Sequence, residues 1–311
     1  MDSDGGGGPM SGNDPALAGQ ITRLLEEVLF SPSVEPGASC EVGDRVGRFL
    51  LVREVGRGGF GLVFEAEDTD LRRRVAIKVL RPERGHTPTT LEWIRREAEA
   101  AARVRHPSVV TLHDVGQWAG GTYLVYELLQ GETLRERLAR GPVPPDEARQ
   151  VLRTVAVGLS RMHAAGVVHR DLKPANVFLD EEGSAKILDL GLAQIAGAVG
   201  IQAGSAPYAP PEQWEGNASD ARVDVYAWGV LATRLLDGKA AGPVTSPPDR
   251  VGRSLRALVD RCRSRDPEFR PADGAAIVAE LDAITRRRRR SRLLATALAG
   301  LVVVGGVYGL G

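Results

Sequence analysis

The segment His169-Arg-Asp-Leu-Lys-Pro-Ala-Asn176 decides how this chain is interpreted. It is too polar for a core strand, and it places a carboxylate at Asp171, a cation at Lys173 and an amide at Asn176. A second carboxylate, Asp189, follows in Leu188-Asp-Leu-Gly191. Asp171 is a candidate general base, and Asp189 and Asn176 carry the hard oxygen atoms that Mg²⁺ prefers. The two stretches therefore predict a catalytic site with a metal ion.

A glycine-rich turn lies upstream, between the strand-like patterns at residues 49–55 and 62–66. Glycines without a side chain let the backbone approach phosphate oxygens. A dinucleotide-binding loop would lead into a helix, whereas another strand follows here. We therefore expect a hairpin that covers a nucleotide. Its residues are Val55, Gly56, Arg57, Gly58, Gly59, Phe60, Gly61, Leu62 and Val63.

Lys78 ends the apolar strand pattern at residues 74–80. Of the 40 basic residues only four are lysines (Lys78, Lys173, Lys186 and Lys239), so the retention of a lysine here favours a compact cation that holds phosphate. An edge-strand lysine is the structural alternative. A lysine that holds phosphate needs a carboxylate to orient it. Glu97 on the next helix pattern is the best candidate, and Glu99 is the second.

Together these motifs resemble those of the eukaryotic-type (Hanks-type) serine/threonine protein kinases of bacteria. The glycine loop, the strand lysine, the catalytic loop and the second aspartate occur in that family's order and spacing, from about Phe49 to Ile284. The resemblance implies an α+β, bilobal protein-kinase fold with a small β-rich N-lobe and a larger α-helical C-lobe. It also implies an ATP-dependent phosphotransferase that acts on Ser and Thr hydroxyls of protein substrates.

The resemblance assigns roles to individual residues. Asp171 matches the catalytic base, Lys78 and Glu97 match the phosphate-holding ion pair, and Asn176 and Asp189 match the ligands of Mg²⁺, for which Mn²⁺ is a possible substitute. Lys173 is similar to the catalytic-loop lysine of Ser/Thr-specific members. The same register places adenine between Val63, Ala76 and Phe178, with Tyr126 as gatekeeper. The backbones of Glu127 and Leu129 form the hinge in this register.

The resemblance also implies two structural roles in the C-lobe. Asp224 braces the catalytic loop, and Glu212 and Arg270 form a buried pair.

Several positions depart from the family pattern. Leu190 replaces a Phe, and Pro210-Pro-Glu212 and Gly204-Ser-Ala-Pro-Tyr208 alter the substrate-docking segment but not the nucleotide site. Two alternatives to an active protein kinase remain: a catalytically weak pseudokinase that acts as a membrane signalling scaffold, and a small-molecule phosphotransferase of similar fold. The intact catalytic residues disfavour the first, and Lys173 disfavours the second.

Composition excludes other classes of protein. The 311 residues allow about two domain-sized units, and 43% hydrophobic residues suffice for a core. Forty acidic residues balance forty basic ones, which argues against a chain built mainly to bind nucleic acid. Cys40 and Cys262 are too few for a disulfide scaffold or a cysteine zinc site.

The ends of the chain differ from its middle. Residues 1–45 are predicted to be largely disordered, with a possible helix at 15–30, and the kinase domain is expected at 46–285. Residues 286–292 contain six Arg, and residues 293–311 carry no charge. Nineteen helical residues span about 28 Å, close to a bilayer core. We therefore expect a C-terminal transmembrane helix.

These ends predict where the protein lies. The Arg block should stay on the cytoplasmic side, so the expectation is a single-pass protein of the cytoplasmic membrane whose kinase domain faces the cytoplasm and contacts inner-membrane lipid. A homodimer is possible through the kinase domain or through the transmembrane helix, where Gly305 and Gly309 have the spacing of a packing motif.

The segment from Asp189 to Gly204 contains no Ser, Thr or Tyr. In the resembling family, an Arg beside the catalytic Asp usually pairs with a phosphorylated residue of this loop. Here Arg170 is present, Gln194 stands where a second basic residue is common, and Ser205 occupies a position that should contact the catalytic residues. We expect a loop that becomes ordered without phosphorylation, the alternative being a flexible loop and a weak enzyme.

Overall fold

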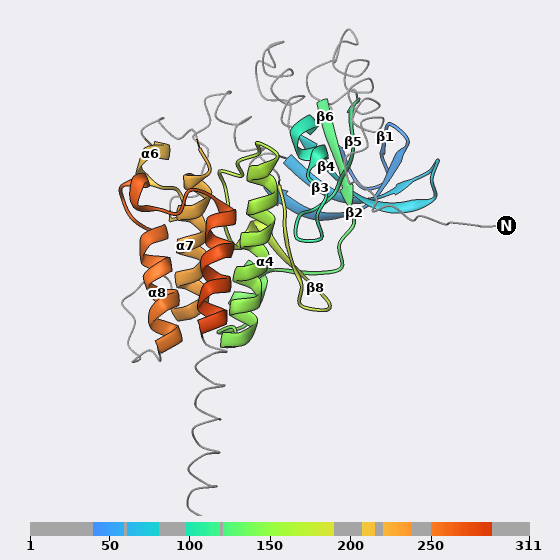
Figure 1. Ribbon diagram of the computed structural model, residues 1–311. Coiled ribbons are helices and arrows are strands. Elements are labelled where there is room, and N and C mark those ends of the chain that lie inside the picture. The colour runs from blue at the N-terminus through green and yellow to red at the C-terminus, as the bar shows by residue number, and fades with distance from the viewer. Residues whose placement is uncertain are drawn as a thin grey trace, which may run out of the picture.

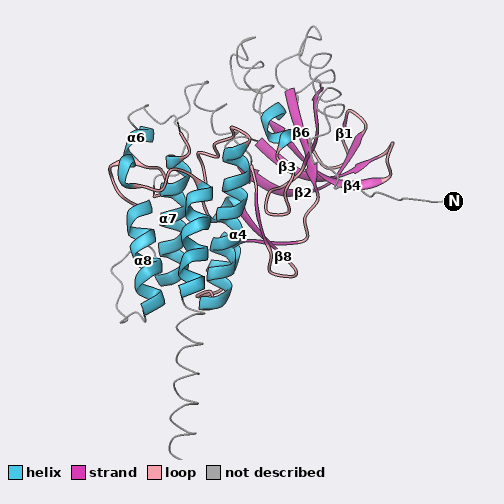
Figure 2. Cartoon of the chain, viewed as in Figure 1, coloured by secondary structure: helices cyan, strands magenta, loops and turns pink. Residues whose placement is uncertain are grey.

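The computed structural model describes residues 40–58, 61–80, 98–118, 121–189, 207–214, 220–237 and 250–287. The first part of the chain forms a twisted sheet and the later part a layer of helices, side by side in Figures 1 and 2. This is the bilobal α+β arrangement that the sequence predicts. The catalytic-loop residues lie where the two parts meet.

The N-lobe sheet has the order β1-β2-β3-β4-β6-β5, with every neighbouring pair antiparallel. Alternating apolar residues form its strands, and their inward side chains build a separate small core around Phe49, Phe64 and Ile77. The strands are β1 (Arg45–Val46), β2 (Phe49–Gly58), β3 (Gly61–Asp68), β4 (Arg73–Leu80), β5 (Leu112–Trp118) and β6 (Gly121–Glu127).

The glycine-rich turn connects β2 to β3 as a hairpin, in which Gly58 pairs with Gly61. A Cβ atom on Gly61 would lie 2.0 Å from the carbonyl oxygen of Val79 on β4, so only glycine fits at this close approach. The predicted strand–turn–strand arrangement is confirmed. Gly59 and Phe60 lie outside the described residues.

The C-lobe is built on the long helix α4 (Pro145–Ala164), which packs against α7 (Arg222–Asp237). Trp228 of α7 is fully buried, and its Nε1 donates to the carbonyl oxygen of Leu152 at 3.0 Å. The remaining elements are α3 (Leu134–Ala139), α6 (Pro211–Trp214), α8 (Arg250–Cys262), a helix over 274–287, the short helices η1 (Pro174–Asn176) and η2 (Pro267–Phe269), and a small sheet of β7 (Gly131–Thr133), β8 (Val177–Asp180) and β9 (Ala185–Ile187).

Three predictions concern residues outside the described part of the chain. These predictions are the possible helix at 15–30, the order of the segment 190–206 and the transmembrane helix at 293–311. Among the described residues, no helix has both the length and the apolar character required to cross a bilayer.

Candidate active site

Lys78 and Asp189 meet although 111 residues separate them in the chain. Lys78 is a buried residue of β4, and its Nζ lies 2.7 Å from Oδ1 of Asp189, which follows β9. Burial alone would raise the pKa of Asp189, but the charge and hydrogen bond of Lys78, with help from His169 and Lys173, hold it below its ordinary value. Asp189 is therefore an anion at neutral pH. This ion pair connects the N-lobe sheet to the catalytic face of the C-lobe.

Asp171 is held by two neighbours in the catalytic loop. Lys173 donates from Nζ to Oδ2 of Asp171 at 2.6 Å. Asn176 donates from Nδ2 to the same carboxylate oxygen at 3.1 Å and to the backbone oxygen of Asp171 at 2.8 Å. The two donors fix the orientation of the carboxylate, as a general base requires.

The arrangement fits a Mg²⁺ ion shared with a nucleotide. Because the amide nitrogen of Asn176 faces Asp171, its oxygen is the atom left to coordinate a metal, and Asp189 supplies an anionic oxygen. One or two such ligands completed by substrate phosphates are usual for Mg²⁺. In the described part of the chain no group of three His, Cys, Asp or Glu side chains could hold a metal alone.

Asp224 holds the backbone of the catalytic loop. This fully buried residue of α7 accepts hydrogen bonds from the backbone N–H groups of His169 and Arg170, both at 2.7 Å, and from Nε2 of His163 at 2.9 Å. Burial would raise the pKa of Asp224, but the hydrogen bonds and charges of His163 and His169 lower it below its ordinary value. The predicted brace is confirmed.

Arg170 shows why the loop needs this brace. Its φ of 63° lies in the left-handed region, which costs a non-glycine residue about 1–3 kcal/mol. The bond from its N–H to Asp224 and the bond from Nε2 of Gln213 to its carbonyl oxygen, at 2.9 Å, hold this conformation. Asp189 also has a positive φ, of 56°, so strained backbone occurs next to Asp171 and at Asp189 itself.

The ring of His169 connects the two halves of the site. The backbone N–H of Asp171 donates to its Nδ1 at 3.2 Å, so Nε2 carries the proton and donates to the carbonyl oxygen of Leu188 at 2.7 Å. Leu188 directly precedes Asp189. One buried imidazole thus sets the spacing between the base and the metal-binding carboxylate.

Sequence reasoning missed His163. Its Nδ1 accepts from the backbone N–H of Gly274 at 3.0 Å, while its Nε2 binds Asp224. The start of the helix over 274–287 is therefore linked through one side chain to the brace of the catalytic loop. A single histidine within an apolar helix pattern gave no signal for this role, because its partners are 61 and 111 residues away.

The predicted adenine-binding residues lie on neighbouring strands. Ala76 of β4 pairs with Tyr126 of β6, and Val63 of β3 pairs with Lys78. Tyr126 is buried, and this burial raises the pKa of its hydroxyl well above the ordinary value. Phe178 of β8 and Val63 are half-buried. Leu129 packs against the core, and Glu97, the predicted partner of Lys78, lies outside the described residues.

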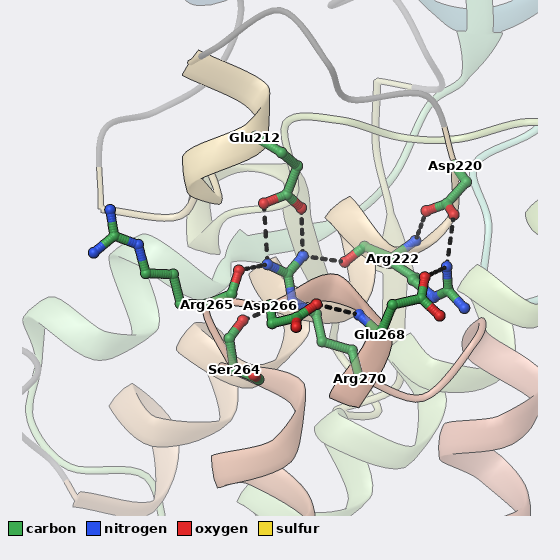
Figure 3. A network of polar contacts seen from close by, with 8 residues as sticks. All are labelled: Glu212, Asp220, Arg222, Ser264, Arg265, Asp266, Glu268 and Arg270. Atoms are coloured by element: carbon green, nitrogen blue, oxygen red, sulfur yellow. Dashed lines mark hydrogen bonds and ion pairs between the residues drawn. The ribbon is translucent and has the colours of Figure 1, made fainter.

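The predicted pair Glu212–Arg270 is confirmed and belongs to a larger polar network (Figure 3). Nη2 of Arg270 lies 3.0 Å from Oε2 of Glu212, and a second contact joins Nη1 to Oε1. The guanidinium also donates to the backbone oxygens of Ser264, Arg222 and Arg265. Every charge in this buried fork has a partner, so α6 is fastened to the loop that follows α8.

Replacement of Asp224 by asparagine should destabilise the protein and impair the loop. An amide cannot accept all three hydrogen bonds, and its N–H₂ would oppose a backbone donor, at a cost of about 3 kcal/mol. The pKa of Asp224 is lowered in the folded state, so its ionised carboxylate stabilises the fold at any pH above the pKa of the unfolded chain. This stabilisation is lost as pH falls through the pKa of the folded state. Denaturant unfolding should show that the free energy of unfolding of Asp224→Asn is lower than that of the wild type by a constant amount from about pH 5 to 7. This difference should shrink below about pH 4.

The exposed Asp260→Asn on α8 is the matched control for this measurement and should change stability little. A deficit of Asp224→Asn no larger than that of the control would contradict the bracing role.

Comparison with known proteins identifies the family. The family model described as "Protein kinase domain" matches residues 49–278, which agrees with the domain expected at 46–285. The chain is similar to the probable serine/threonine-protein kinase pknA2 of Bifidobacterium longum, with 34% identity over 268 residues that cover 78% of this chain and 35% of the relative.

It is also similar to the serine/threonine-protein kinase PknL of Mycobacterium tuberculosis, with 35% identity over 263 residues, 76% of this chain and 65% of PknL. The chain therefore spans between about a third and two thirds of the length of these two curated relatives. Among solved structures, the PknI kinase domain of M. tuberculosis aligns with a TM-score of 0.64 at 24% identity, over 80% of this chain and 99% of that domain, which shows the fold.

The motifs, the geometry and these matches agree, and they confirm the resemblance to the eukaryotic-type kinases of bacteria: this chain belongs to the protein kinase family.

Proposed function

We propose that this protein transfers the γ-phosphoryl group of ATP to Ser and Thr hydroxyls of protein substrates. The observation that carries the proposal is the joint placement of Asp171, Asn176, Asp189 and Lys78 at one site, with Lys173 bound to the candidate base. Phosphoryl transfer requires mainly positioning and charge neutralisation, and these side chains supply both.

The roles follow from the contacts. Asp171 accepts the proton of the acceptor hydroxyl, and its carboxylate is held in position by Lys173 and Asn176. Lys78 holds the α- and β-phosphates of ATP and stays oriented through Asp189. Asn176 and Asp189 would hold Mg²⁺, which neutralises phosphate charge when it is bound.

The chain is proposed to be tethered to the cytoplasmic membrane by residues 293–311, with the domain at 46–285 in the cytoplasm. The support comes from the sequence: an uncharged run of bilayer length follows six arginines. The helix over 274–287 leads into this block, and its last two residues, Arg286 and Arg287, are exposed.

Activity is proposed to be independent of phosphorylation in the segment 189–204. That segment has no Ser, Thr or Tyr, so Arg170 has no acceptor there to pair with after modification. Clustering at the membrane or a partner protein then sets the activity.

Asp171→Asn should reduce the rate of phosphoryl transfer by about 10²–10⁴-fold. Its affinity for ATP should stay near that of the wild type, because Asp171 contacts the acceptor and not the nucleotide. Single-turnover transfer to a generic basic protein and direct nucleotide titration measure the two effects. The exposed Asp260→Asn is the control; a wild-type rate for Asp171→Asn would refute the assignment of the base, and a wild-type protein without transfer would favour the scaffold.

At high salt, deletion of residues 293–311 should release the protein from the membrane fraction while the transfer rate is retained. Because the Arg block remains, the deleted form should still bind anionic vesicles, at about 1 kcal/mol per Arg near the surface, and should lose this binding at high salt. Sedimentation with and without vesicles measures both effects. A full-length chain found wholly in the soluble fraction after gentle lysis would contradict the tether.

Phosphatase treatment of the purified enzyme should leave its initial rate on an external substrate nearly unchanged, because no acceptor exists between Asp189 and Gly204. Mass spectrometry before and after treatment would establish that phosphate was removed. Loss of most activity, followed by recovery upon autophosphorylation at any position in 189–212, would show that the loop is regulated by phosphate after all.

A further inference from the structure

A cavity of about 430 Å³ lies away from the catalytic residues and is lined by basic and imidazole side chains. Its walls come from three parts of the fold: the loop after the helix over 98–103, the segment that enters β5, and β9. The lining residues are Arg105, His106, Pro107, Thr111, His113 and Lys186. None of them has a role in the proposed transfer reaction.

Among the described residues, Glu127 is a carboxylate that contacts this lining, and both of its oxygens already have partners. Oε2 of Glu127 lies 2.7 Å from Nζ of Lys186, and Oε1 accepts from the backbone N–H of Thr111 at 2.8 Å. Burial would raise the pKa of Glu127, but the hydrogen bonds from Lys186 and Thr111 and the charge of Lys186 hold it below its ordinary value. Glu127 balances the positive charge of Lys186. Arg105 adds a second positive charge to the cavity, and Glu127 does not neutralise it.

The pKa values of the two imidazoles, His106 and His113, are lowered in part by nearby positive charges. Burial lowers the pKa of His106 and of His113, and nearby arginines lower both further: Arg161 at His106, and Arg73 with Arg105 at His113. Glu127 and Asp114 act in the opposite direction at His113 without reversing the shift. An anion in the cavity would oppose these effects and raise both pKa values.

Hydrogen-bond donors are available from several directions. Nδ1 of His106 accepts from the backbone N–H of Ser108 at 3.1 Å, so the proton of the neutral ring is on Nε2. Lys186 has three N–H bonds, and Glu127 takes one. Arg105 is exposed and presents a planar set of five donors.

We propose that this cavity is an anion site that binds the dianionic phosphate of a phosphomonoester, through Arg105, Lys186, His106 and His113. A phosphate has enough acceptor oxygens to bind donors that line the cavity from three segments, whereas a carboxylate has only two oxygens. The phosphate can belong to a small molecule or to a phosphorylated side chain, since both present the same group.

The site is also connected to the nucleotide region. An anion bound to Lys186 would compete with Glu127 for the charge of the same ammonium group, and the backbone of Glu127 follows Tyr126, the predicted gatekeeper, on β6. Occupancy should therefore alter ATP affinity. This consequence rests on the proposed function, whereas binding of the anion does not.

The test is an NMR titration of the full chain, without nucleotide, that follows the ring signals of His106 and His113. Inorganic phosphate, a phosphoserine peptide and its unphosphorylated form are added at constant ionic strength. Phosphate should shift both signals saturably and raise both pKa values. Arg105→Gln should weaken binding by about tenfold without unfolding an exposed position, and Lys186→Gln should also weaken it, whereas the exposed Arg103→Gln should not.

Tighter binding of the phosphopeptide than of phosphate would assign the site to a phosphorylated protein, and equal or weaker binding would assign it to a small phosphate compound. Absence of a saturable shift, the same shift with chloride alone, or unchanged binding by Arg105→Gln would overturn the proposal. Because the readout requires no catalysis, its failure is distinguishable from failure of the proposed kinase activity.

Discussion

One buried carboxylate holds the catalytic face together. Asp224 is fully enclosed in the C-lobe and would be costly there without partners, yet three N–H groups point at it. Two of them belong to the backbone of His169 and Arg170. Their bonds offset the strained conformation of Arg170 and fix the backbone that leads into the next residue, Asp171.

The rest of the site depends on that placement. The ring of His169 connects the loop to Leu188 and so to Asp189, and Asp189 binds Lys78 of the N-lobe sheet. A chain of short contacts therefore runs from α7 through the loop to β4. His163 adds a branch to Gly274, where the C-terminal helix begins.

Local patterns predicted most of the elements and the chemistry. Alternating apolar residues and a glycine turn predicted the β2–β3 hairpin. The spacing of Asp171, Asn176 and Asp189 predicted one site, because Asp171 and Asn176 come just before β8 and Asp189 comes just after β9, the strand that pairs with it. The resemblance supplied Glu212–Arg270 and the role of Asp224, which no periodicity indicates.

Contacts between distant elements could not be predicted. Nothing in the sequence near Lys186 or Glu127 shows that they bind each other, because their pairing follows from the backbone bonds that join both β9 and Glu127 to the segment 108–111. The same holds for His163, whose partners lie on other helices. The sequence shows which chemical group a residue carries, whereas tertiary packing determines which other residue that group contacts.

The most direct test of the central claim is a calorimetric titration of a non-hydrolysable ATP analogue, with and without Mg²⁺, into the wild type, Asp189→Asn and the exposed control Glu181→Gln. Mg²⁺ should strengthen binding to the wild type and to the control but not to Asp189→Asn. Without the metal, Asp189→Asn should bind at least as tightly as the wild type, because a carboxylate that competes with the phosphates for Lys78 has been removed. An equal effect of Mg²⁺ on all three proteins would contradict the account.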